Sequence, residues 1–443
     1  MSTATHSRQL PPLLSRTTCP QCWHKFAPED VLWISEHEDL FNLDDRVPNA
    51  QLRFLPSRFT AHGEARDPRG FPCHRLACPS CHLEIPRPIL ELDSFFLSVI
   101  GCPGSGKSYF LAAMARQLRQ VLPLKFSIGF TDSDATLNMR LRDYETSLFA
   151  NSRPDQLQEL QELIRKTQET GDDFGYADVR YGTQAVRYLR PFMFSMRAQQ
   201  DHPNPRRRGH GRTICVYDNA GESFLPGQDR AANPVTRHLR ESSVLFFVFD
   251  PLQDSRFRAL GPELRDGIVD KSHLGSQEGV FQEAATRIRQ LGLSSARKDK
   301  RPVIVVVTKC DRWVHHADRS IRELSPVTNA TITDADGTGY KSGAVDTDVV
   351  ERVSKRVRTL LLKTTPEVVT AVESFAENVR YVPVSATGWN TRVDSKTGRP
   401  LIRPGEVEPF WADVPFLYAL AMSRMDLVPK VRRDRQGITV SPS

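Results

Sequence analysis

One stretch decides the fold of this chain: Gly101-Cys102-Pro103-Gly104-Ser105-Gly106-Lys107-Ser108. It fits the spacing G-x-x-x-x-G-K-[ST], follows an apolar segment at 95–100 that predicts a buried strand, and precedes a helical pattern at 109–120. Its three glycines let the backbone wrap closely around a phosphate chain with the N–H groups pointing inward. The residues expected to contact phosphate are Gly101, Gly104, Ser105, Gly106, Lys107, Ser108 and Tyr109.

The last two residues of the stretch carry the charge chemistry. Lys107 can reach the β- and γ-phosphates of a nucleotide, where it would stabilise the charge that develops during hydrolysis. Ser108 can ligate Mg²⁺, and the N-terminus of the following helix favours an anion. The sequence therefore predicts a Mg²⁺-dependent nucleotide site with Lys107 as a catalytic residue.

The overall composition is that of a soluble globular protein, with 39% hydrophobic and 26% charged residues in a chain of 443. The net charge of +7 permits contact with nucleic acid without indicating it. The densest basic run, 206–212, is expected to be a solvated hairpin tip. No apolar run approaches the length of a membrane span and no signal-peptide core is present, which predicts a cytoplasmic protein.

Two C-P-x-C pairs stand near the N-terminus, and in a cytoplasmic protein such pairs favour a metal over disulfides. Four thiolates would give Zn²⁺ the closed tetrahedral shell of a structural site, with Cys19, Cys22, Cys78 and Cys81 as the ligands. The competing ligands are His24, Cys73, His74 and His82. The module resembles a zinc ribbon or a related treble-clef finger, which implies docking to proteins or nucleic acids.

Buried strands are also predicted for four further apolar segments, 212–217, 244–249, 303–307 and 381–384. The first ends in D-x-x-G, where Asp218 can hold Mg²⁺ through water and Gly221 can offer its N–H to the γ-phosphate. The third ends in T-K-C-D, where Asp311 can accept hydrogen bonds from the ring N–H and the amino group of guanine. The last ends in S-A-T at 385–387, whose backbone can contact the guanine oxygen.

The order of these motifs carries more weight than any single match, because a parallel sheet brings all of them to its carboxyl end. The order resembles that of Ras-like, TRAFAC-class GTPases over residues 93–430. The resemblance implies GTP and Mg²⁺ as cofactors, with nucleotide contacts from Asp218, Gly221, Thr308, Lys309, Asp311, Ser385 and Ala386, and with Mg²⁺ near Ser108 and Asp218. The zinc module ahead of such a domain resembles bacterial GTPases of the double-GTPase group, which are associated with conflict and defence gene clusters.

The switch residues depart from the usual pattern. The segment 186–196 is expected to pair antiparallel with 213–217, which makes Thr183 the expected Mg²⁺ ligand and catalytic threonine, with Thr131 and Thr136 as rivals. Glu222 stands where many such GTPases carry a water-orienting Gln. Because a carboxylate near a γ-phosphate is electrostatically awkward, hydrolysis is expected to be slow without a partner.

The expected organisation is a zinc-ribbon-like module at 1–92 and an α/β GTPase domain at 93–430, with a mainly parallel sheet flanked by helices. Insertions are expected at about 122–180, with a helix at 154–169, and at about 315–347, with a surface loop at 325–347. Helices are also predicted at 347–363 and 410–425, and a disordered tail at 431–443.

The leading expectation is a GTP-binding and GTP-hydrolysing switch or regulatory protein that works with a protein effector or activating partner. An ATPase of another P-loop class stays open because the stretch 101–108 permits it, although Asp311 and Ser385 argue against it. A nucleotide-binding scaffold that does not hydrolyse and acts through its zinc module also stays open, because Glu222 is compatible with it.

Overall fold

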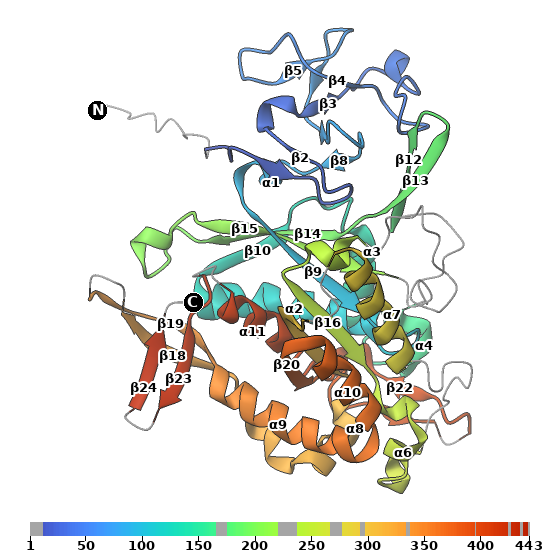
Figure 1. The fold of residues 1–443 in the computed structure, drawn as a ribbon, viewed down its shortest axis with the longest axis vertical. Helices are drawn as coiled ribbons and strands as arrows, with labels where there is room; N and C mark the ends of the chain where they lie inside the picture. Colours follow the sequence, from blue (N-terminus) through green and yellow to red (C-terminus); the bar gives the residue numbers. More distant parts are fainter. Residues whose placement is uncertain are drawn as a thin grey trace.

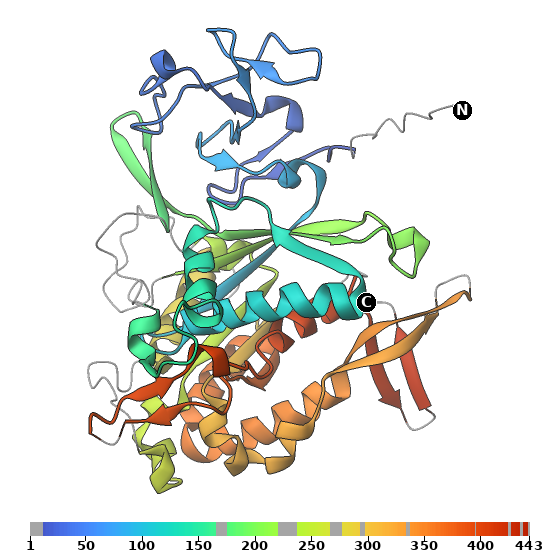
Figure 2. The same ribbon diagram turned by 180° about the vertical axis from the view of Figure 1, so that it is seen from behind.

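The computed structural model describes residues 12–164, 175–219, 237–265, 277–292, 297–333, 337–394, 396–423, 427–434 and 437–441. A small N-terminal module lies above a larger α/β body in the view of Figure 1, and Figure 2 shows the same arrangement from behind. Among the described residues, every helix is too short or too polar to cross a bilayer.

The body is built around a seven-stranded sheet in the order β10-β14-β15-β9-β16-β17-β20. The strands are β9 (Ser94–Ile100), β10 (Ile128–Asp132), β14 (Phe192–Ala198), β15 (Gly211–Asp218), β16 (Val244–Phe249), β17 (Asp299–Val307) and β20 (Ala376–Pro383). Only β14 runs against the other strands, since it pairs antiparallel with both β10 and β15. The predicted mixed α/β fold with a mainly parallel sheet is therefore confirmed.

Helices cover both faces of this sheet because its central strands are apolar on both sides. Phe246 of β16 packs 6.1 Å from Phe110 of α2 (Lys107–Phe126), whereas the next residue, Phe247, packs 5.0 Å from Phe281 of α7 (Gln277–Gln290), measured between ring centroids. Helix α11 (Val414–Met422) shares the first face with α2, and α10 (Pro366–Phe375) shares the second face with α7.

The N-terminal module is made of short strands. They form one sheet in the order β4-β3-β7-β8 and two strand pairs, with bounds β1 (Thr17–Thr18), β2 (Lys25–Phe26), β3 (Leu32–Ile34), β4 (Arg53–Phe54), β5 (Ala65–Arg66), β6 (Pro72–Cys73), β7 (Leu76–Ala77) and β8 (Glu84–Ile85). Helix α1 (Pro88–Glu91) leads from the module into β9. A hairpin from the body, β12 (Tyr176–Tyr181) and β13 (Gln184–Leu189), rises beside the module (Figure 1).

The module docks on the sheet through aromatic side chains. Trp23 packs against Phe96 of β9 and Tyr217 of β15, with ring centroids 5.0 and 5.3 Å away. The buried hydroxyl of Tyr217 donates a hydrogen bond of 2.6 Å to the carbonyl of Pro20. Because alternate residues of a strand point to opposite faces, Tyr217 meets the module while Val216 belongs to the core under α2.

The remaining elements lie around this core. Further helices and strands form the connections: α3 (Met139–Phe149), α4 (Leu160–Leu163), α5 (His238–Glu241), α6 (Ser255–Arg258), α8 (Cys310–Ala317), α9 (Thr347–Thr364), β11 (Gln158–Glu159), β21 (Arg392–Val393) and β22 (Pro400–Ile402). A second, four-stranded sheet has the order β18-β19-β23-β24, formed by β18 (Val327–Thr333), β19 (Gly339–Asp346), β23 (Lys430–Asp434) and β24 (Gly437–Ser441).

Three expectations about local structure are wrong. The segment 154–164 forms turns, β11 and the single turn α4 rather than the start of a long helix, and Leu157 is exposed. The predicted surface loop at 325–347 is the β18–β19 hairpin, whose Ile332 packs on Ala344 and Val431. The predicted disordered tail instead pairs its first strand, β23, with β19, since edge strands offer unpaired backbone groups.

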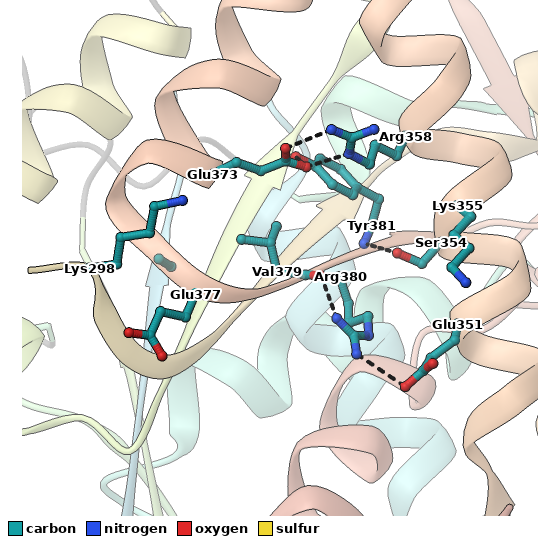
Figure 3. Close-up of a pocket in the computed structure, with 11 residues that line it drawn as sticks. Lys298, Glu351, Ser354, Lys355, Arg358, Glu373, Glu377, Val379, Arg380 and Tyr381 are labelled. Carbon is teal, nitrogen blue, oxygen red and sulfur yellow. Dashed lines mark hydrogen bonds and ion pairs between the residues drawn. The ribbon is translucent and has the colours of Figure 1, made fainter.

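The outer edge of the main sheet is protected by a side chain. The Tyr381 backbone N–H of edge strand β20 donates to the hydroxyl of Ser354 on α9 at 2.9 Å, which caps a group that could otherwise pair with another strand. A pocket of about 310 Å³ lies there, and Figure 3 shows Arg358 reaching Glu373 across it. Two ion pairs line it, Arg358 with Glu373 and Arg380 with Glu351, and it lies along the strand rather than at the carboxyl end of the sheet.

Two glycines in the C-terminal part of the body allow the energetic cost of backbone strain to be compared with the cost of steric crowding. Gly388 has φ +77° and a Cβ placed on it would meet the carbonyl of Glu408 at 2.2 Å, whereas Gly398 has φ +68° with open space around it. Replacing Gly398 by Ala is expected to cost about 1–2 kcal/mol of unfolding free energy through backbone strain alone. Gly388→Ala should cost at least about 1 kcal/mol more. Urea titration of both variants checks this order, and equal losses would contradict the close approach.

Candidate functional site

The carboxyl ends of five neighbouring strands meet at one edge of the sheet. The residues that follow β9, β16, β17 and β20 are joined there by hydrogen bonds, and β15 ends beside them in Asp218, which pairs in register with Val99. The order of the strands changes direction at β9, whose neighbours β15 and β16 both come later in the chain. In open α/β sheets, ligands bind in the crevice at such a point.

The loop after β9 needs its glycines. A Cβ on Gly101 would lie 2.7 Å from the carbonyl of Val248 on β16, so no larger residue fits there. Gly104 and Gly106 have φ of +74° and +92°, which other residues adopt at a cost. Gly106 ends the loop and α2 begins at Lys107, which places the partial positive charge of a helix N-terminus next to the loop.

Side chains of the loop bind the loop itself. The Lys107 ammonium donates to the carbonyls of Gly101 and Cys102 at 2.6 and 3.1 Å, and the buried Ser105 hydroxyl donates to Cys102 at 2.8 Å. Ser108 lies half-buried in the first turn of α2. The amine is thus held against the backbone of the loop.

The T-K-C-D segment is bonded to this loop. The Thr308 hydroxyl donates to the carbonyl of Ser105 at 2.9 Å, although the two residues are far apart in sequence. Lys309 has φ +56° and its ammonium contacts a buried carboxylate, that of Asp250, at 2.6 Å. The segment therefore reaches from the glycine-rich loop to the end of β16.

Asp311 and Ser385 also meet as expected. The Ser385 hydroxyl donates to the Asp311 carboxylate at 2.6 Å, and burial raises the pKa of that carboxyl above its ordinary value. Ala386 follows, half-buried, in the turn after β20. The carboxylate of Asp311 thus lies between the segment after β17 and the residue that follows β20.

Asp218 ends β15 with an unusual feature. Its side chain is only 4% exposed; one oxygen lies 3.5 Å from the Arg140 guanidinium, and the other has no hydrogen-bond partner among the described residues. A buried oxygen without a partner is costly, and a cation or a cation-bound water would satisfy it. The carboxylate of Asp218 and the hydroxyl of Ser108 each offer oxygen, the ligand atom that Mg²⁺ prefers. Gly221 and Glu222 lie outside the described residues.

Among the expected residues, Thr183 is not brought to this edge, and Tyr109 stands in the first turn of α2 with its side chain directed toward α4. Thr183 lies exposed in the turn between β12 and β13, the hairpin that rises beside the N-terminal module (Figure 1). The Tyr109 hydroxyl donates to the carbonyl of Leu160 and accepts from the N–H of Ile164 at 3.3 Å, so this side chain holds the α4 segment against α2. Burial raises the pKa of Tyr109 to about 12.

Asp250 is a site residue that the motifs do not reveal. It follows β16 directly, is fully buried, and accepts from Lys309 and from the N–H of Leu252. Gln277 fixes its backbone with two hydrogen bonds of 2.8 and 2.9 Å. The sequence indicates Asp250 in one respect: it directly follows the apolar run 244–249, just as Asp218 follows the apolar run 212–217.

The N-terminal module holds a separate candidate metal centre. The four sulfur atoms of Cys19, Cys22, Cys78 and Cys81 lie within 4.8 Å of one another, and all four residues are buried. Cys19 lies 3.7 Å from Cys81, and Cys22 lies 3.7 Å from Cys78, between sulfur atoms. Four close buried cysteines can hold a zinc ion in a closed shell.

The two C-P-x-C turns have matching geometry. The N–H of the first cysteine in each turn donates to a carbonyl five positions on, Cys19 to His24 and Cys78 to Leu83, at 2.9 and 3.0 Å. The residue after each second cysteine, Trp23 or His82, has φ of 67° or 59°. Two unrelated segments therefore adopt one local fold, which aims both pairs of sulfurs at a common point.

The competing ligands lie outside the four-cysteine cluster, and the surroundings of the four thiols shift their pKa values in different directions. His82 contacts the Asp44 carboxylate at 2.8 Å and Cys73 is buried in β6, outside the cluster. Burial raises the pKa of Cys19, whereas hydrogen bonding to the Cys19 thiol lowers the pKa of Cys22. A divalent cation bound among the four sulfurs would favour their deprotonated form.

No family model matches the chain, and a comparison with known proteins finds a distant relative. Over 264 residues the chain is 24% identical to a protein of Mycolicibacterium smegmatis named "Putative ESX-1 scaffolding and assembly protein SaeC". The match covers 56% of this chain, and the chain spans 60% of the length of that relative.

Replacing one cluster cysteine should remove the metal. Cys22→Ser is expected to lose zinc and to lower the melting temperature sharply, because zinc binding contributes about 10–16 kcal/mol in small structural sites. Cys73→Ser is the matched control, since Cys73 is equally buried but lies outside the cluster. Elemental analysis after dialysis and thermal unfolding measure both effects. Full zinc content in Cys22→Ser would rule out the four-cysteine site.

Proposed function

We propose that this protein is a Mg²⁺-dependent GTP-binding and GTP-hydrolysing switch or regulatory protein. The observation that carries the proposal is the chain of contacts at the sheet edge: Thr308 bonds the glycine-rich loop, and Asp311 bonds Ser385. These contacts join the proposed phosphate-binding loop to the T-K-C-D segment, and that segment to the residue that follows β20, which supports one shared nucleotide site. The orphan oxygen of Asp218 beside this edge supports a role toward Mg²⁺.

Guanine is the base that these contacts favour. Its ring N–H and its amino group are both donors, which suit the carboxylate of Asp311, whereas adenine offers no matching pair. Each unmet buried polar group costs about 1–3 kcal/mol, so the expected preference for GTP over ATP is tens- to thousands-fold. Asp250 supports this role by holding Lys309 beside Asp311.

For hydrolysis, the proposal assigns charge stabilisation to Lys107 and to the backbone N–H groups of residues 101–108. Glu222 is the proposed water-orienting group, and its charge supports slow turnover without a partner. Thr183 would need the β12–β13 hairpin to leave the module before it could reach Mg²⁺, because Val179 and Tyr188 of that hairpin pack with the cysteine cluster.

A second candidate function is a nucleotide-binding scaffold that does not hydrolyse its ligand. The Mycolicibacterium smegmatis relative is named a putative ESX-1 scaffolding and assembly protein, which favours this candidate. The docking of the N-terminal module on β15, one residue before Asp218, would give such a scaffold a route from nucleotide to module. Both candidates share the nucleotide site and differ only in turnover.

Replacing the acceptor oxygen of Asp311 with a donor group tests whether this residue recognises guanine, because the variant should gain binding of a different base. Xanthine presents a carbonyl where guanine has its amino group, so Asp311→Asn is expected to weaken GTP binding and to create binding of XTP. Dissociation constants of GTP, ATP and XTP with Mg²⁺ measure the change. Wild-type protein that binds ATP as tightly as GTP would instead support an ATPase of another P-loop class.

Turnover separates the switch from the scaffold. Lys107→Ala is expected to lose tight binding of GTP, whereas Lys125→Ala, exposed at the other end of the same helix, should bind normally. Wild-type protein should release inorganic phosphate from GTP at a slow, measurable rate. Tight GTP binding without any phosphate release would favour the scaffold, and unchanged GTP affinity in Lys107→Ala would refute the phosphate site.

A further inference from the structure

A third cluster of ligand atoms lies on the surface of the body, apart from the cysteines and the sheet edge. Glu263, His315 and His316 place a carboxylate oxygen and two imidazole nitrogens within 4.8 Å of one another. The Nε2 atoms of both histidines approach the same oxygen, Oε1 of Glu263, at 3.3 and 2.8 Å. Neighbouring residues of a helix normally point about 100° apart, so this convergence on one point is informative.

The surroundings hold the three groups in place. The histidines stand in the last turn of α8, whose Trp313 is buried against Phe257 with ring centroids 5.9 Å apart. Glu263 stands in the single turn 262–264, and its carbonyl accepts a hydrogen bond from Arg312 of α8. Its carboxylate lies over Gly261, where a Cβ would come within 2.3 Å of it, so the glycine leaves the space that the carboxylate occupies.

We propose that Glu263, His315 and His316 form a binding site for a divalent transition metal ion such as Zn²⁺, Co²⁺ or Ni²⁺. Ligands about 2.0–2.1 Å from a tetrahedral ion lie roughly 3.3 Å from each other. The observed separations of 2.8 and 3.3 Å therefore need only small shifts to admit the ion. Two imidazoles and one carboxylate suit these metals rather than Mg²⁺ or Ca²⁺, which prefer oxygen ligands.

The site differs from the cysteine cluster in its exposure to solvent and in the segments that it connects. The three side chains are partly exposed, so a fourth position faces solvent and stays open to water or to another ligand. The ion would link the segment after β16 to α8, the helix whose first turn carries Asp311. The inference does not depend on the proposed GTPase function, because it rests on these three residues alone.

Cobalt titration of the zinc-loaded full-length protein, without nucleotide, tests the site. Cobalt held by nitrogen and oxygen ligands should give visible absorption bands without the near-ultraviolet band of sulfur ligation. His316→Ala and Glu263→Gln are each expected to raise the dissociation constant for Co²⁺ at least about 10-fold. His62→Ala, which changes an exposed histidine of the N-terminal module, should leave it unchanged.

The outcomes separate a built site from incidental binding. Equal Co²⁺ affinity in wild type, His316→Ala and Glu263→Gln would overturn the proposal, as would absorption from sulfur ligation alone. Thermal unfolding without added metal checks that the variants fold. Added Zn²⁺ is expected to raise the melting temperature of wild type and of His62→Ala but of neither site variant, and an equal rise in all four proteins would also overturn it.

Discussion

The parallel pairing of β9 with β15 on one side and β16 on the other is the constraint on which the rest of the structure depends. It brings the ends of the strands to one edge and forces the loop after β9 against β16, where only Gly101 fits beside the carbonyl of Val248. The contact between Thr308 and Ser105 then follows, because β17 lies next to β16 and ends at the same level. The order of the strands thus positions the backbone of the candidate nucleotide site, and side-chain hydrogen bonds then connect its loops.

Strand β15 joins this edge to the N-terminal module. Its residues alternate between two environments: Ile214 and Val216 pack in the main core, whereas Cys215 and Tyr217 pack with the cysteine cluster. Tyr217 stacks on the buried His238 at 4.9 Å, and His238 in turn contacts Asn219, next to Asp218. Burial lowers the pKa of His238 to about 3, so the ring stays neutral near pH 7 and is kept in place by its hydrogen bonds to Ser98 and Asn219. A continuous set of buried contacts therefore runs from the cysteine turns to the end of β15.

The sequence predicted the parts that follow from local patterns. The runs 95–100, 244–249 and 303–307 are strands because continuous apolar character over this length, rich in Val, Ile and Phe, suits strands buried on both faces. The cysteine turns were also predictable, because their geometry is local. The spacing of Leu157, Leu160 and Leu163 suggested a helix, but Leu157 has no core to face and the segment folds as turns. The contact of Lys309 with Asp250 and the meeting of Glu263 with two histidines depend on tertiary packing between segments that no local pattern relates.

The docking of the module has a consequence for how the chain matures. The two cysteine turns leave the ribosome long before β15 does, yet the ring of Trp23 packs on Tyr217 of that strand as well as on Phe96. During synthesis the module must therefore keep its shape through its own cysteine cluster while that ring waits for its partner strand. Zinc bound by the four cysteines would then hold the module in shape over that interval, during which the side of Trp23 that packs on Tyr217 is uncovered.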